Sequence, residues 1–205
     1  YMGDWSSDVC SSDLIIKFAE LIGLHQVSEV GYEADDLMFA IAQDMQAQGF
    51  NVVLITADKD MGQTLTSDAI YLYDYFKDQL LSKSAFEEKL GFPVEKLPFY
   101  FALLGDTSDN IPGVHGIGKK TAQELVVQFD SLEDLYARID MVTTARIKNA
   151  LLVNKENAFL SRQLFLLAYV QTGTSRDDLA FNPALWSMAR PFYMEIGRAS
   201  CRERV

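Results

Sequence analysis

The chain has 205 residues and a formal net charge of −11, and it is long enough for one α/β domain with a smaller appendage. No apolar run approaches the ~20 residues of a membrane span, and no secretory signal is visible. Cys10 and Cys201 stand near opposite ends with no cysteine between them, so a disulfide framework is not expected and a cytoplasmic monomer is the default.

Both ends of the chain differ in character from the rest. Residues 4–14 repeat Ser-Ser-Asp without helical or strand periodicity, and residues 197–205 are polar and basic. Both stretches resemble translated cloning or adapter sequence, so residues 1–14 and 197–205 are predicted to be a non-native extension and tail. A disordered native tail is the alternative.

The first part of the chain alternates helical and extended patterns. Apolar residues at Leu37, Ala40 and Met45 mark one face of a helix that ends at Gly49. The run NVVLIT at residues 51–56 is typical of a buried parallel strand. This alternation predicts a mostly parallel sheet with flanking helices. The expected elements are a helix at 15–24, an extended piece at 25–30, helices at 33–48 and 58–65, and strands at 51–56 and 69–73.

After about residue 82 the pattern becomes helical. Ser131 and Thr143 are capping residues that begin two of the expected helices. We divide the native part into an incomplete α/β metal-binding core at 15–105 and a helical part with a helix–hairpin–helix element at 106–196. The expected helices lie at 84–90, 98–104, 119–129, 131–137 and 143–165.

Three acidic clusters occur where a parallel sheet places its ligands, at the carboxyl ends of strands and at adjoining helix ends. Their members are Glu33, Asp35, Asp36, Asp58, Asp60, Asp106 and Asp109. Seven carboxylates in one pocket would repel one another, unless divalent cations such as Mg²⁺ or Mn²⁺ occupy it. Two such ions ~4 Å apart can support hydrolysis of a phosphodiester.

Each cluster also has a simpler interpretation. Asp35, Asp36 and Asp58 can cap helices or interact with the positive end of the helix dipole. The last cluster can shape a turn. Lys59, between two acids, can make its segment an ordinary solvated surface.

The uneven distribution of charge bears on the same question. Residues 1–100 hold 6 Lys and Arg against 17 Asp and Glu, whereas residues 101–205 hold 12 of each. Such an excess of acid argues against binding nucleic acid, because phosphate contacts supply most of the non-specific affinity. The objection weakens if the acidic half holds metal ions and a basic part of the protein is missing.

The most specific stretch is IPGVHGIGKKTA at residues 111–122. Its glycines permit positive φ and close approach of another backbone, and the helix start that follows offers N–H groups to an anion. We expect these groups to hold a DNA phosphate without reading bases, although an ordinary tight turn between packed helices is the alternative. The residues expected to bind DNA are His115, Gly116, Ile117, Gly118, Lys119, Lys120 and Thr121.

Four motifs resemble, in order, the signature of bacterial 5′–3′ exonucleases and flap endonucleases, a family that includes the N-terminal nuclease domain of DNA polymerase I. They are GYEADD at 31–36, TADKD at 56–60, GDTSDNIPG at 105–113 and GVHGIGKKTA at 113–122. The resemblance extends from about residue 15 to about residue 196. It implies a PIN-like α/β 5′ nuclease core followed by a helix–three-turn–helix subdomain.

The resemblance also implies an activity, namely two-metal hydrolysis of DNA phosphodiesters at 5′ ends and 5′ flaps of branched duplexes during replication and repair. The acidic helix start would bind the first metal. Asp58 and Asp60 would serve both metal positions, and Asp106 and Asp109 the second.

The hairpin has further implications from the same family. A K⁺ ion can bridge hairpin carbonyls and phosphate, which points here to Gly113, Val114 and Ile117. Lys119 stands where an acidic residue is commoner and His115 where Lys is commoner, and both changes are compatible with phosphate contact.

One departure from the family concerns its first segment. The family begins with two Asp-bearing strands and a basic helical arch, and nothing in residues 1–14 resembles them. We therefore expect the native protein to be active and this fragment to be weak or inactive.

Two other functions compete with this one. GDTSDN at residues 105–110 resembles the late acidic motif of haloacid-dehalogenase-like phosphatases, but the Asp-x-Asp that such enzymes need near the first strand occurs only at 58–60. A non-catalytic module that binds DNA structure through the hairpin alone is the second alternative.

Overall fold

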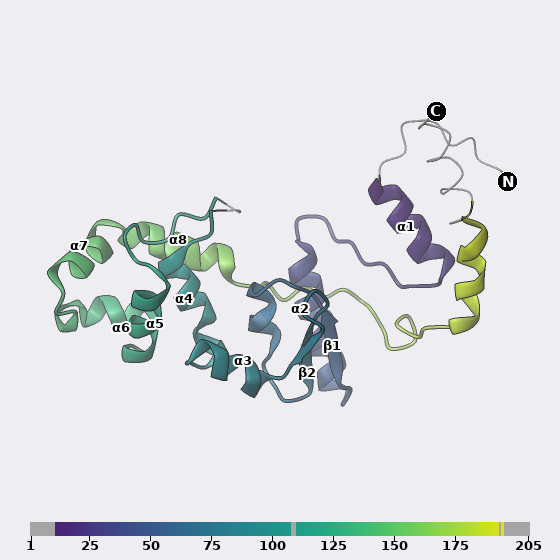
Figure 1. Ribbon diagram of the computed structural model, residues 1–205, viewed down its shortest axis with the longest axis horizontal. Coiled ribbons are helices and arrows are strands. Elements are labelled where there is room, and N and C mark those ends of the chain that lie inside the picture. The colour runs from purple at the N-terminus through teal and green to yellow at the C-terminus, as the bar shows by residue number, and fades with distance from the viewer. Residues whose placement is uncertain (1–10, 108–109, 193, 195–205) are drawn as a thin grey trace. The chain divides into compact units, whose positions relative to one another are not determined.

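The computed structural model describes residues 11–107, 110–192 and 194, which fall into two compact units (Figure 1). The larger unit contains residues 32–170, and the smaller contains the described residues on either side of it. Most of the predicted extension and the whole predicted tail lie outside the described residues.

In the smaller unit, helix α1 (Ser11–Leu21) contacts the 3-10 helix η4 (Pro183–Met188). Phe18 and Trp186 meet edge to face, with ring centroids 5.9 Å apart. α1 confirms the first predicted helix, although it begins within the segment predicted to be non-native. The extended piece predicted after it takes no regular secondary structure.

The larger unit contains a sheet in the order β1 (Val52–Ile55), β2 (Ile70–Asp74) and β3 (Gln79–Leu81). β1 and β2 are parallel with Val52 opposite Ile70, and β2 and β3 are antiparallel. The first two strands confirm both predicted strands and their parallel pairing. β3 was not predicted, because three residues are too few to show an alternating pattern.

Only one face of β1 is packed into the core. Val52 and Leu54 pack against buried side chains, whereas Val53 is 51% exposed and Ile55 is 67% exposed. The prediction that this strand is buried therefore holds for alternate residues only. Successive strand residues point to opposite faces, and an all-apolar run does not reveal which face is covered.

Helix α2 (Ala34–Ala47) packs against β1 and against the 3-10 helix η1 (Asp60–Thr64). Its apolar face is buried as predicted. Gly49 follows with φ +88, a conformation that glycine adopts at low cost, and so ends the helix. η1 replaces the longer helix predicted at 58–65.

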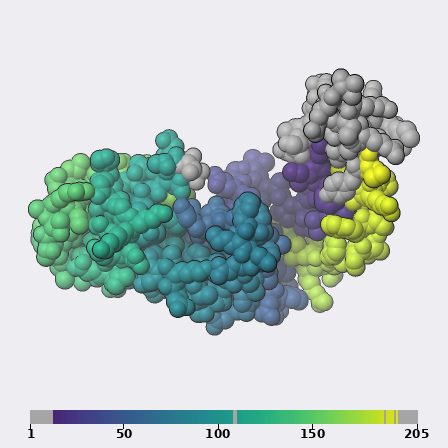
Figure 2. Space-filling model, in the orientation of Figure 1, coloured from purple at the N-terminus to yellow at the C-terminus, as the bar shows by residue number. Residues whose placement is uncertain are grey.

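The rest of the larger unit is helical, and the helix α4 lies at its centre. α4 (Leu97–Leu104) packs against α5 (Lys119–Gln128), α8 (Lys155–Phe165) and η1. Phe101 of α4 stacks on Phe165 of α8, with ring centroids 4.9 Å apart. In the space-filling view, α4 to α8 belong to one continuous mass coloured teal to light green (Figure 2). The elements are α3 (Lys83–Leu90), η2 (Val94–Lys96), α4 (Leu97–Leu104), α5 (Lys119–Gln128), α6 (Leu132–Ala137), η3 (Ile139–Met141), α7 (Ala145–Val153) and α8 (Lys155–Phe165).

The single helix predicted at 143–165 is wrong, because the chain breaks it at Asn154. The backbone there has φ −106 and ψ 22, and the Asn154 side-chain amide donates to Ala150 O at 2.8 Å. A short polar side chain that bonds the preceding turn competes with continuation of the helix. Two helices, α7 and α8, result.

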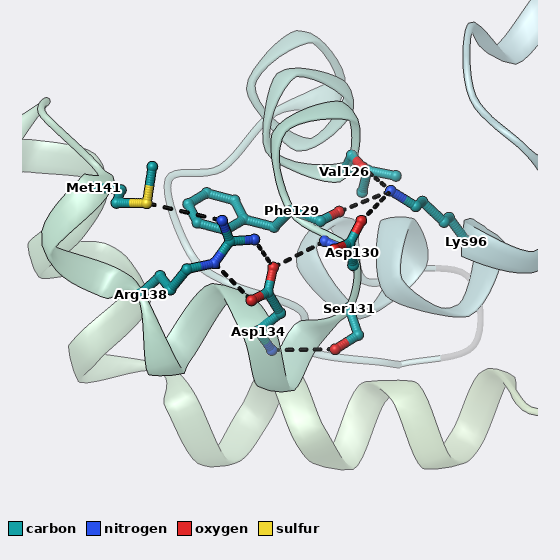
Figure 3. A network of polar contacts seen from close by, with 8 residues as sticks. All are labelled: Lys96, Val126, Phe129, Asp130, Ser131, Asp134, Arg138 and Met141. Carbon is teal, nitrogen blue, oxygen red and sulfur yellow. Dashed lines mark hydrogen bonds and ion pairs between the residues drawn. The ribbon is translucent and has the colours of Figure 1, made fainter.

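The C-terminal end of α5 is held by a network of polar contacts (Figure 3). Lys96 Nζ donates to Val126 O at 3.0 Å and to Phe129 O at 2.9 Å. These are carbonyls that the end of a helix leaves without an intrahelical partner. Directly after α6, the Arg138 guanidinium hydrogen-bonds Asp134 of that helix and holds the pKa of the Asp134 carboxyl below its usual range. The network fixes α5, the helix that begins directly after the hairpin glycines.

Candidate active site

The first acidic segment lies at the start of α2, where Glu33 is the residue that precedes the helix. Asp36 Oδ2 accepts the Glu33 N–H at 3.3 Å, and its Oδ1 accepts the Ala168 N–H at 2.7 Å. Both oxygens of Asp36 therefore accept backbone bonds, which agrees with the capping alternative for this residue. Asp35 is half-buried beside it.

The second acidic segment follows β1. Asp58 Oδ1 accepts the Asp60 N–H at 2.9 Å, and the Asp58 N–H donates to Thr56 Oγ1 at 3.0 Å. The side chain of Asp58 thereby turns the chain into η1, as Asp often does. Asp58 is exposed and Asp60 is half-buried.

The third acidic segment follows α4 and is held by a short two-stranded bridge. Asp106 and Ile111 exchange backbone hydrogen bonds of 3.0 and 2.7 Å. Gly105 has φ +68, and a Cβ added there would lie 2.7 Å from the Gly113 nitrogen, so glycine is needed for this close approach. Asp109 lies outside the described residues.

A contact between side chains brings the second and third segments together. Lys59 Nζ lies 3.4 Å from Asp106 Oδ2, and the two side chains are 61% and 16% exposed. In addition, η1, which contains Asp60, packs against both α2 and α4. The elements that carry the three acidic segments are therefore neighbours.

The donor chemistry of these segments suits a hard divalent cation, because all the candidate ligands are carboxylates. The position of the Lys59 ammonium beside Asp106 shows that this part of the site already accommodates positive charge. Nevertheless, within residues 11–107 and 110–192, no three or more His, Cys, Asp or Glu side chains form a group that could hold a metal ion. The assignment of metal ligands remains a prediction.

The inner side of the glycine hairpin is anchored in the core. Val114 and Ile117 are 2% and 7% exposed, and the Val114 N–H donates to Leu103 O of α4 at 2.9 Å. The Gly113 N–H donates to Ser161 Oγ of α8 at 2.9 Å. The side chain of Ile117 therefore supports the fold, whatever its backbone contacts.

The outer side of the hairpin is exposed and open. A Cβ added at Gly116 or Gly118 would meet no described atom within 4 Å, and Lys119 and Lys120 are exposed at the start of α5. The first backbone bond of this helix is donated by Ala122 to Gly118 O, at 2.9 Å. The N–H groups that precede it are the ones that helix geometry leaves available to an anion.

A cavity of about 290 Å³ adjoins the second acidic segment and includes Asp58 and Lys59 in its lining. Asp74, at the end of β2, also lines it and accepts backbone N–H bonds from Phe76 and Lys77. The hydrogen bond from the Lys77 ammonium holds the pKa of Asp74 below its usual range. Asp74 therefore closes the β2–β3 turn.

Sequence reasoning missed the residues that join these segments across the fold. Ser161 supports the hairpin from 48 positions away, and the backbone of Ala168 meets Asp36 from 132 positions away. Neither residue stands in a local motif, so the sequence offers no signal for its role.

None of the helices among the described residues is long and apolar enough to cross a membrane.

Two family models match successive parts of the chain. Residues 9–91 match the N-terminal resolvase-like domain of 5′–3′ exonucleases. Residues 92–185 match the C-terminal SAM fold of the same enzymes. The matches meet between α3 and η2.

Curated relatives agree with these matches. The thermostable DNA polymerase I of Thermus thermophilus is 38% identical over 151 residues, which cover 74% of this chain and 18% of the polymerase. A 5′–3′ exonuclease of Buchnera aphidicola is 36% identical over 156 residues, covering 73% of this chain and 54% of the exonuclease. The chain thus spans only part of the length of each relative.

Solved structures agree as well. The T5 5′-exonuclease with bound zinc has a TM-score of 0.57 and 26% identity, covering 66% of this chain and 50% of that one. The catalytic core of Rad2 in complex with DNA substrate has a TM-score of 0.59 and 15% identity, covering 91% of this chain and 66% of that one. The likeness to Rad2 is one of fold, and together these matches confirm the predicted fold class.

Proposed function

Since the chain belongs to the 5′–3′ exonuclease family, whose two domain models it matches in succession, we propose that it acts on DNA as a metal-dependent 5′ nuclease. The proposed substrate is branched or 5′-ended duplex DNA, cut at 5′ ends and 5′ flaps in the cytoplasm of a bacterium during replication and repair. One observation carries the proposal. The 3.4 Å contact of Lys59 with Asp106 sets the acidic loop after β1 beside the acidic turn after α4.

In this proposal the seven carboxylates, from Glu33 to Asp109, hold two divalent ions, Mg²⁺ or Mn²⁺. Bound ions of this kind supply an activated water and stabilise the leaving oxygen of a phosphodiester. The chain's own contribution is to position the oxygens: Asp36 is fixed by two backbone N–H groups, and Asp58 by the turn it makes with Asp60. The T5 5′-exonuclease, which binds divalent metal ions, supports this assignment.

The hairpin is proposed to hold the DNA backbone. Its exposed side offers the first N–H groups of α5, the helix dipole and the ammonium groups of Lys119 and Lys120. These groups contact phosphate rather than bases, so they position a duplex without reading its sequence. A K⁺ ion at the carbonyls of Gly113, Val114 and Ile117 is part of the proposal. We accordingly assign residues 15–105 to the metal-binding nuclease core and residues 106–196 to the helical part that binds DNA, with Asp106 and Asp109 of the second part completing the metal site.

Cleavage of a 5′-flap duplex in Mg²⁺ by a chain extended at its N-terminus to the length of its relatives, compared with flap binding in Ca²⁺, tests the proposal. We expect Asp106→Asn to lower the cleavage rate by about 100-fold or more, because it removes a carboxylate proposed to hold the cation that would stabilise the negative charge developing in the transition state. Flap binding in Ca²⁺ should change little. Asp68→Asn, which alters an exposed carboxyl before β2, should leave both unchanged. Equal cleavage by the two variants would contradict the assignment of Asp106.

A second candidate is a module that binds DNA structure without cutting it. The open outer side of the hairpin favours it, since this surface needs no metal to attract phosphate. Flap binding in Ca²⁺ with no Mg²⁺-dependent cleavage, even by a chain extended at its N-terminus to the length of its relatives, would support this candidate over the nuclease. Absence of flap binding would count against both.

A further inference from the structure

Lys59 is a positive charge that lies beside the third acidic segment. It lies between Asp58 and Asp60 in sequence, and its Nζ is 3.4 Å from Asp106 Oδ2. The ammonium also lies 5.3 Å from the centre of the Phe101 ring, a favourable position for a cation. The ammonium therefore joins the second acidic segment, which carries it, to the third.

This ion pair is long and open to solvent. Its 3.4 Å separation contrasts with the 2.6 Å pair of Lys83 and Glu95. The Lys59 side chain is 61% exposed, and exposed pairs contribute little stability. Lys59 also borders the cavity of about 290 Å³, so its flexible stem has room to turn away from Asp106.

We propose that Lys59 is a displaceable counter-ion, a positioning residue that holds Asp106 in the metal-free protein and leaves it when a divalent cation binds. The inference rests on the proposed metal-dependent function. Its physical basis is competition, because an ammonium and a divalent cation satisfy the same carboxylate oxygens. Removal of the ammonium then weakens the metal-free fold and strengthens cation binding.

The inference is tested by titrating the full 205-residue chain with MnCl₂ in a calorimeter, which measures the affinity for Mn²⁺. We expect Lys59→Met to bind Mn²⁺ about two- to fivefold more tightly than the unaltered chain, the change that loss of one exposed ion pair corresponds to. In EDTA the same variant should unfold about 1–3 °C lower, and Mn²⁺ should close this gap. A purely structural role would shift the unfolding temperature without changing the Mn²⁺ affinity.

Lys89→Met is the matched control, because Lys89 lines the same cavity but donates to the neutral Gln79 Oε1, at 2.8 Å. Lys59→Arg keeps the charge and should bind Mn²⁺ within about twofold of the unaltered chain, whereas Lys59→Gln should repeat the effect of Lys59→Met.

Equal affinities for the Lys59→Met and Lys89→Met variants would overturn the inference. If the unaltered chain binds Mn²⁺ and Asp106→Asn weakens that binding, the proposed metal site survives such a result. A chain that binds no Mn²⁺ would overturn both.

Discussion

Gly113 is held between neighbouring backbones, and its conformation is one that other residues avoid. It has φ +59, and an added Cβ would lie 2.5 Å from the carbonyl carbon of Leu104 and close to the Gly105 nitrogen. Its N–H is fixed by the buried hydroxyl of Ser161. The backbone therefore cannot shift easily to make room for a side chain.

We predict that Gly113→Ala lowers the free energy of unfolding by about 2–4 kcal/mol, because positive φ and overpacking both add cost. Gly116→Ala is the control, since Gly116 also has positive φ, at +91, but its added Cβ would meet no described atom within 4 Å. It should cost about 1 kcal/mol. Urea unfolding of both variants measures the difference, and similar losses would show that the close approach of Gly113 to Gly105 does not matter.

At the scale of single elements, α5 depends on a residue outside it. Lys96 places its ammonium on two carbonyl oxygens at the end of α5, where the helix dipole favours a cation. Its side chain is 21% exposed, so these hydrogen bonds are partly shielded from water.

Lys96→Met should therefore lower the free energy of unfolding by about 1–2 kcal/mol, as expected for hydrogen bonds from a charged donor. Lys148→Met removes an ion pair to Asp140, whose side chain is 93% exposed, and should cost less than about 1 kcal/mol. Chemical denaturation followed by circular dichroism compares the two. A larger loss for the Lys148 variant would contradict the role given to Lys96.

The sequence predicts those helices and strands that residue spacing and residue type within one short segment are enough to indicate. The face of α2, the cap Ser131 and the parallel pair of β1 and β2 all follow from spacing and residue type. The cap predicted at Thr143 is wrong, because the residue that precedes α7 is Thr144, and its side chain makes no capping hydrogen bond. The prediction fails at Asn154, where one side-chain bond breaks a helix whose apolar pattern continues. Local signals do not weigh such a bond against helix propensity.

The candidate site is predictable only in its parts. The acidic segments and the glycine hairpin are visible in the sequence, but the contact of Lys59 with Asp106 spans 47 positions and that of Gly113 with Ser161 spans 48. Such contacts depend on how α4 packs against η1 and α8. No local pattern contains that information, so the sequence predicts candidate ligands without their arrangement.

For the whole molecule, the distribution of charge bears on the proposed binding of DNA. The net charge is −11, and the excess acid lies in residues 1–100, whereas residues 101–205 are balanced. The acidic part repels phosphate unless cations neutralise it, so the affinity that the chain's own side chains supply must come from local positive groups. Lys119 and Lys120 are the pair that adjoins the N–H groups of α5.

Replacement of both Lys119 and Lys120 by Met should therefore weaken flap binding and reduce its salt dependence. Each phosphate contact releases counterions, so the slope of log affinity against log salt concentration should become shallower by about 2. Fluorescence anisotropy of a labelled flap at several KCl concentrations, in Ca²⁺, measures this slope. Lys89→Met removes an exposed charge outside the hairpin and should leave the slope nearly unchanged. If both variants keep the original slope, the phosphate contacts lie on another surface, and the open side of the hairpin has no role in holding DNA.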